Sequence, residues 1–170
     1  MRLSQYECFI IKNTGDTVFG NKLKGPDIGK AYDNNNSNDI KLDGNVYSRY
    51  EVKNLQDKYA YYSIIWNVNI LGNRVPHFVK LVLKGKINLY YVGEETKESS
   101  GKKIDVFAFQ KGNTAEIKEL NKDEIVTLLE DNKEAQEKFI QYFKPERKNR
   151  NVISLDFKRI MEVVNIYNGN

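Results

Sequence analysis

The residues best suited to nucleophilic or metal chemistry in this chain are His77 and Cys8, the single histidine and the single cysteine. His77 follows Pro76 at the entrance of an expected strand, whereas Cys8 falls in another strand, and no Gly-x-Ser-x-Gly sequence occurs. A zinc site needs about four donors, more than one His and one Cys supply without several carboxylates. The sequence therefore predicts no catalytic residue, metal site or cofactor. His77 is expected at a partly exposed strand edge and Cys8 as a small buried hydrophobe.

Two stretches resemble ligand-binding loops only superficially. Gly15 and Gly20 have the spacing of a phosphate loop, but Asn and Lys follow Gly20 where that loop needs Lys and then Ser or Thr. Residues 13–16 are instead expected to form a hairpin turn. Residues 33–44 resemble a calcium loop, but the sixth position lacks Gly and the twelfth is Gly44 rather than an acid. Neither stretch predicts a ligand.

Carboxylates are the remaining candidates for acid–base chemistry. Glu94, Glu95 and Glu98 lie in an expected charged loop, while Asp123-Glu124 and Glu130-Asp131 resemble charges at helix ends. A hydrolase built on two of them would need carboxyl groups about 5 to 10 Å apart in a concave pocket. This remains an alternative function.

Aromatic residues are the more informative feature, since the chain has 11 tyrosines. Strand alternation would place Tyr59 and Tyr61 on one face, and Tyr62 and Trp66 on the other. The preferred interpretation is that these aromatic side chains pack in the core or against neighbouring strands. An exposed face would instead offer rigid amphipathic rings to a protein or glycan partner. These four residues are the candidate partner-binding site.

Basic residues exceed acidic ones by 27 to 23, which gives a net charge of +4. The densest cluster, a candidate anion-binding site, comprises Lys144, Arg147, Lys148 and Arg150. A solvated loop between helices explains the cluster with fewer assumptions. Nucleic-acid binding would want stacking aromatics or a groove-reading helix beside it, so nucleic acid is not the expected partner, although weak binding through residues 144–150 stays an alternative.

The expected secondary structure changes along the chain, from strands to helices. Residues 6–118 are β-rich, with Asp43-Gly44 as the strongest hairpin signal. Residues 79–89 alternate apolar and polar types, which predicts one buried and one solvated face. No apolar run approaches the roughly 20 residues that span a bilayer.

Residues 121–168 are expected to be helical. Asn121 and Glu124 form a capping-box pattern, Asn132 caps a second helix, and a third begins near Ser154 and stops at Asn168-Gly169. Strands followed by helices predict an α+β fold: an antiparallel sheet or partly open barrel of about six to eight strands, then two or three C-terminal helices. One domain, residues 1–170, is expected.

The order of "IIKNTGDTVFG", "DIKLDGNVYSRYEV", "FVKLVLKGKINLYYV", "FAFQKGNTAEIKEL" and "ISLDFKRIMEVVNIYN" resembles a family of small exported proteins of Bacteroidota. That family, itself uncharacterised, opens with a GDTxxG hairpin after a signal peptide and closes with an IxxVxxYN helix. The resemblance implies a periplasmic, outer-membrane-associated or secreted protein whose leader has been removed. It transfers no catalytic residue.

The sequence thus favours a non-enzymatic envelope or secreted binding module, accessory to a larger assembly, whose partner is another envelope protein or a glycan. It leaves the ligand, the oligomeric state and the choice between barrel and open sheet undetermined.

Overall fold

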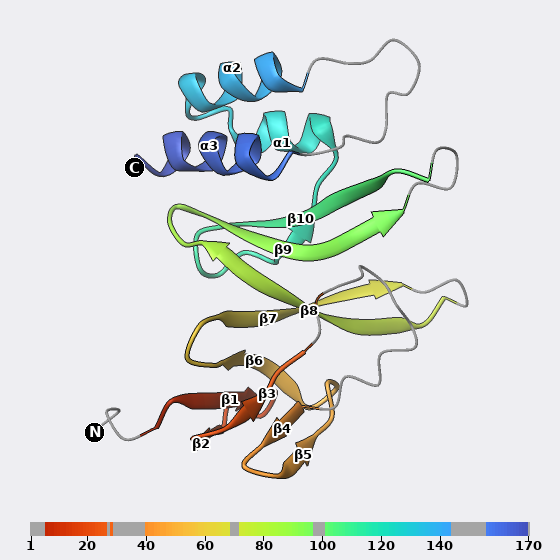
Figure 1. Ribbon diagram of the computed structural model, residues 1–170. Coiled ribbons are helices and arrows are strands. Elements are labelled where there is room, and N and C mark those ends of the chain that lie inside the picture. The colour runs from red at the N-terminus through yellow and green to blue at the C-terminus, as the bar shows by residue number, and fades with distance from the viewer. Residues whose placement is uncertain are drawn as a thin grey trace. The chain divides into compact units, whose positions relative to one another are not determined.

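A computed structural model describes residues 6–26, 28, 40–68, 72–96, 101–143 and 156–169. Antiparallel strands occupy the chain as far as Glu119 and three helices follow, so the predicted α+β class is confirmed (Figure 1). The chain forms two compact units, Met1–Leu81 and Val82–Asn170.

The first unit contains an antiparallel sheet and a smaller three-stranded sheet. The larger sheet has the linear order β2-β1-β6-β7-β8, which makes it open among the described strands. Its strands are β1 (Cys8–Lys12), β2 (Thr17–Gly20), β6 (Val52–Gln56), β7 (Tyr61–Val68) and β8 (Arg74–Leu83), with the unit boundary inside β8. The smaller sheet joins β3 (Leu23–Lys24), β4 (Ile40–Leu42) and β5 (Asn45–Tyr47).

Two predicted turns are confirmed in this unit. Gly15 adopts a φ of +92° between β1 and β2, and its N–H donates to the Lys12 carbonyl at 2.9 Å. Asp43 and Gly44 have φ values of +49° and +87°. Positive φ at both central residues suits the tight turns that match the twist of paired strands. Residues 13–16 therefore form the predicted hairpin turn between β1 and β2.

The core of the first unit joins the two sheets. Ile10 and Leu55 from the larger sheet, and Ile40 and Leu42 from the smaller one, belong to one buried cluster. Cys8 is buried in the same cluster, as predicted, and burial raises the pKa of its thiol. Burying these apolar side chains supplies the main stabilisation of the unit.

The second unit places three helices over a hairpin (Figure 1). Its strands are β9 (Ile87–Thr96), β10 (Lys103–Lys111) and β11 (Lys118–Glu119), in the order β11-β10-β9. Its helices are α1 (Lys122–Leu128), α2 (Lys133–Tyr142) and α3 (Phe157–Asn168). The core includes Leu89, Phe109, Phe139 and Ile160, each at most 2% exposed.

The helix starts follow from local capping. The Asn121–Glu124 capping box is present, and the Asn132 side chain accepts from the Ala135 N–H at 3.1 Å. The third helix begins at Phe157 rather than near Ser154, because Asp156 is its N-cap and accepts from the Arg159 N–H. A carboxylate there satisfies one of the helix's unpaired N–H groups.

The predicted solvated face is wrong for β9. Asn88 is 3% exposed and Tyr90 is 4% exposed, so both faces of the strand are buried at this point. The Asn88 amide donates to the Gln110 side chain at 2.9 Å and accepts from the Gly85 N–H at 3.0 Å. Burial of this polar side chain is tolerated because its hydrogen bonds are made.

Candidate functional site

The four aromatic residues singled out by the sequence occupy three different environments. Tyr59 is 86% exposed in the turn between β6 and β7. The Asp57 carboxylate accepts from the backbone N–H groups of Tyr59 and Ala60, at 2.8 and 2.6 Å, and so holds a local turn. The prediction that Tyr59 shares a strand face with Tyr61 is therefore wrong, because β7 starts only at Tyr61.

Tyr61 and Tyr62 are half-buried parts of the scaffold. Tyr62 packs against the first unit's core, opposite Leu55 of β6. Burial raises the pKa of the Tyr61 hydroxyl, an effect that a hydrogen bond with Ser63 opposes. Burial also raises the pKa of the Tyr62 hydroxyl, and the neighbouring Asp57 carboxylate adds to that shift. Tyr62 is therefore part of the core packing, and Tyr61 is half-buried beside it in β7.

Trp66 differs, because it is 42% exposed and has an exposed aromatic neighbour. Its ring centroid lies 6.2 Å from that of Tyr50, with 57° between the ring planes, and Tyr50 is 50% exposed. The Arg49 guanidinium lies 5.4 Å from the centroid of the Tyr50 ring. Arg49, Tyr50 and Trp66 are called the aromatic patch from here on.

A hydrogen-bonded turn fixes the Tyr50 side of the aromatic patch. The Glu51 N–H donates to the Ser48 carbonyl at 2.9 Å, and the Glu51 carboxylate accepts from the Ser48 N–H at 3.3 Å. The Asn13 side chain donates to the Tyr50 carbonyl at 2.6 Å, and the Asn13 N–H donates to the Glu51 carbonyl at 2.8 Å. The turn is thereby attached to the opening hairpin, so the Tyr50 ring projects from a fixed backbone.

The strand ladder fixes the Trp66 side of the aromatic patch. Trp66 lies opposite Pro76 of β8, and Val68 lies opposite Arg74. Since alternate residues of a strand share a face, Arg74 lies on the same face as Trp66 and is its diagonal neighbour. Arg74 is exposed.

His77 belongs to the opposite face, where it pairs with Ile65. It is half-buried inside β8, so its predicted place at a strand edge or entrance is wrong. Burial lowers the pKa of the imidazole, and the Arg49 charge lowers it further. Both effects favour the neutral imidazole at neutral pH.

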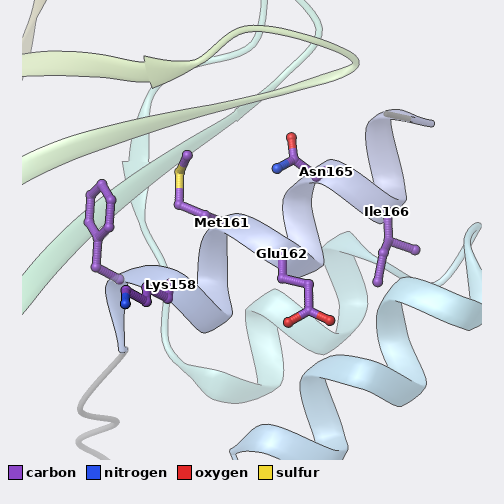
Figure 2. Close-up of a pocket in the computed structure, with 6 residues that line it drawn as sticks. Lys158, Met161, Glu162, Asn165 and Ile166 are labelled. Atoms are coloured by element: carbon purple, nitrogen blue, oxygen red, sulfur yellow. The ribbon is translucent and has the colours of Figure 1, made fainter.

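The second unit has a shallow hollow of about 430 Å³ along α3. It is lined by Phe157, Lys158, Met161, Glu162, Asn165 and Ile166, five of which are labelled in Figure 2. Glu162 accepts from the Tyr142 hydroxyl at 2.5 Å and pairs with Lys138 at 3.0 Å. These contacts, the tyrosine hydrogen bond first, lower the pKa of Glu162. Such a carboxylate is held ionised and is poorly suited to act as a general acid.

Two carboxylates that the sequence put forward, Asp131 and Glu94, also have structural partners. Asp131 accepts from the Tyr167 hydroxyl at 2.8 Å and pairs with Lys111 at 2.8 Å, and the Lys111 contact contributes most to lowering its pKa. Glu94 lies in β9, not in a loop as expected, and pairs with Lys103 at 2.8 Å. Within the described part of the chain, no three His, Cys, Asp or Glu side chains gather where they could hold a metal ion.

The candidate anion-binding site lies outside the described residues: Lys144, Arg147, Lys148 and Arg150. Glu98 and residues 33–39 of the stretch that resembles a calcium loop also lie outside them. None of the helices described here combines the length and apolar character needed to cross a membrane.

Tyr50 and Arg49 are the site residues that sequence reasoning missed. They follow the Asp43-Gly44 hairpin, and no spacing rule connects them with Trp66, 16 and 17 positions later. Comparison with known proteins adds no further residue: no protein-family model, no curated protein and no solved structure matches this chain.

Proposed function

We propose that this protein is a non-enzymatic binding module of the bacterial envelope or of the secreted fraction, and that it recognises a partner protein through the aromatic patch. The observation that carries the proposal is the exposure of Trp66 and Tyr50 side by side, with Arg49 over the tyrosine ring. Trp, Tyr and Arg are the residue types most enriched at the energetic centres of protein interfaces.

Fixed geometry supports this choice of site. The backbone that carries the two rings is already fixed by the Ser48–Glu51 turn and the β7–β8 ladder, so little backbone entropy is lost on binding. The envelope location and the accessory role rest on the likeness to exported proteins of Bacteroidota.

Capture from envelope extracts tests the proposal. The wild-type protein and the Trp66→Ala and Tyr50→Ala variants would be immobilised, with Tyr59→Ala as the matched control, since Tyr59 is more exposed but lies in a different turn. We expect one partner to be retained by wild type and Tyr59→Ala and lost with the two patch variants. Retention of the same proteins by all four would refute the proposal.

A photo-crosslinking residue at position 50 provides the direct readout. It should join the captured partner covalently, whereas the same residue at position 59 should not. Crosslinking from position 59 alone would place the interface elsewhere.

A further inference from the structure

A second arginine extends the aromatic patch beyond the three residues that define it. Arg74 is exposed on the face of β8 that carries Trp66's cross-strand partner Pro76, two positions away. Cross-strand diagonal neighbours lie within reach of long side chains. Two arginines therefore lie near the rings: Arg49, 5.4 Å from the Tyr50 ring centroid, and Arg74, the diagonal cross-strand neighbour of Trp66.

Neither arginine is neutralised by the part of the chain that the structure describes. The ion pairs found there are made by lysines, and none involves Arg49 or Arg74. The nearest acid in sequence, Glu51, turns back to accept from the Ser48 N–H at 3.3 Å. Both arginines thus keep their guanidinium donors out of ion pairs with the carboxylates of the described residues.

The position of Arg49 suits carboxylate recognition. The Arg49 guanidinium lies 5.4 Å from the Tyr50 ring centroid, within cation–π range, and forms no ion pair with a described residue. Its N–H donors form a fork that matches the two oxygens of a carboxylate. The ring contact also limits the freedom of the side chain, so less entropy is lost when an anion binds.

The geometry of the rings favours a protein over a nucleic acid or a flat sugar chain. Successive bases stack on aromatic side chains along a basic groove. Tyr50 and Trp66 are instead tilted by 57°, with centroids 6.2 Å apart, so the two rings do not form one flat platform. An angled pair can receive one apolar or aromatic side chain edge-on.

Resting on the proposed function, we infer that the partner is an acidic protein segment. One apolar or aromatic side chain of that segment contacts Tyr50 and Trp66, and neighbouring carboxylates bind Arg49 and Arg74. The overall charge of +4 favours the approach of such a segment.

Trp66 makes the inference measurable, since it is the only tryptophan in the chain and its fluorescence reports on this surface alone. The full-length protein would be titrated with the peptide Ac-EEFEE-NH2, with its amide counterpart Ac-QQFQQ-NH2, with polygalacturonate and with oligo-dT. We expect the acidic peptide to change Trp66 emission and to bind about tenfold more tightly than the amide peptide at low salt. This preference should shrink as salt is added.

Variants separate the two arginines from general charge effects. Arg74→Gln and Arg49→Gln should each weaken acidic-peptide binding about fivefold or more. Lys80→Gln is the matched control, because Lys80 is exposed on the same face of β8 but lies opposite Tyr62, away from the aromatic patch. It should change binding by less than about twofold. Arg74 is exposed, so its variant should fold even if Arg49→Gln does not.

Equal binding of the two peptides, no fluorescence response to the acidic peptide at millimolar concentration, or tighter binding of polygalacturonate or oligo-dT would each overturn the acidic-segment inference. These outcomes leave the proposed function standing if Trp66→Ala still abolishes partner capture. Capture that is insensitive to Trp66→Ala would instead refute the proposed function itself.

Discussion

The side-chain amide of Asn168, the last residue of α3, hydrogen-bonds both backbone groups of Ile87, the first residue of β9. Its oxygen accepts from the Ile87 N–H at 2.9 Å, and its nitrogen donates to the Ile87 carbonyl at 3.0 Å. The amide therefore pairs with the backbone N–H and carbonyl of Ile87 in the way that the backbone of a neighbouring strand would. Because the two residues are 81 positions apart, this contact attaches the end of the chain's last helix to the hairpin beneath it.

Asn168→Ala should destabilise the protein. The change removes both hydrogen bonds and leaves the backbone groups of the fully buried Ile87 without these partners, so the free energy of unfolding should fall by about 1 to 3 kcal/mol. Urea denaturation measures the loss. Asn165→Ala is the control, since Asn165 lines the open hollow of the same helix (Figure 2) and should cost under about 0.5 kcal/mol. Equal losses would contradict the structural role of Asn168.

Gly85→Ala should be destabilising only while Asn168 is present. A Cβ at position 85 would lie 2.3 Å from Cγ and Nδ2 of the Asn168 side chain, so the amide would be displaced from Ile87. We expect Gly85→Ala to cost about 1 to 3 kcal/mol alone and much less in an Asn168→Ala background. Gly25→Ala, where an added Cβ meets nothing within 4 Å, is the control. If the stability losses of Gly85→Ala and Asn168→Ala simply add in the double variant, the clash with the Asn168 side chain is not the cause of the loss.

Asp43→Ala should destabilise the first unit through its turn. The Asp43 carboxylate accepts from the Lys22 N–H at 2.8 Å and from the Asn21 N–H at 3.1 Å, and Asp43 itself has a φ of +49°. Alanine loses both the acceptor and the tolerance for positive φ, so we expect a loss of about 2 to 3 kcal/mol. Asp43→Asn keeps an acceptor and that tolerance, and should retain most of the stability. Thermal unfolding of wild type, Asp43→Ala and Asp43→Asn measures the difference. Equal losses of stability in the two variants would show that neither the side-chain acceptor nor the positive φ at position 43 matters.

Acid should weaken the second unit through Asp131. Contacts with Lys111 and Tyr167 hold the folded-state pKa of Asp131 below its ordinary value of 3.8, so this carboxylate stabilises the fold at pH values above 3.8. The contribution is lost as the pH falls through the lower folded-state pKa. Asp131→Asn should therefore lower stability at neutral pH and flatten the decline at acid pH.

Urea midpoints measured from neutral pH downward test this sign. Asp123→Asn is the control, because Asp123 is an exposed carboxylate in the first turn of α1 and has no ion pair with a described residue. Parallel acid profiles for wild type and Asp131→Asn would show that the Lys111 and Tyr167 contacts do not stabilise the fold.

Features that the sequence determined by itself depend on contacts within a few residues. The Gly15 and Asp43-Gly44 turns and the caps at Asn121 and Asn132 were predictable, because positive φ and side-chain-to-backbone hydrogen bonds are local properties. The order of strands before helices followed from the change in hydrophobic period, and it fixed the α+β class.

Local rules failed where a neighbour from a distant part of the chain decided the outcome. Alternation predicted that Asn88 would be solvated, yet its amide donates to the Gln110 side chain across the hairpin at 2.9 Å, so the side chain is buried with a partner. Gly20 had the spacing of a phosphate loop, but its lack of a side chain serves packing. A Cβ there would lie 2.5 Å from Cδ1 of Leu42.

The candidate site shows the same division. Aromatic content pointed to Trp66, but only the tertiary structure separated it from the half-buried Tyr61 and Tyr62 and placed Tyr50 beside it. Exposure and ring-to-ring contact depend on how strands from distant parts of the chain pair and how the two sheets pack. Those are long-range interactions, and a residue's type and its spacing along the chain do not encode them.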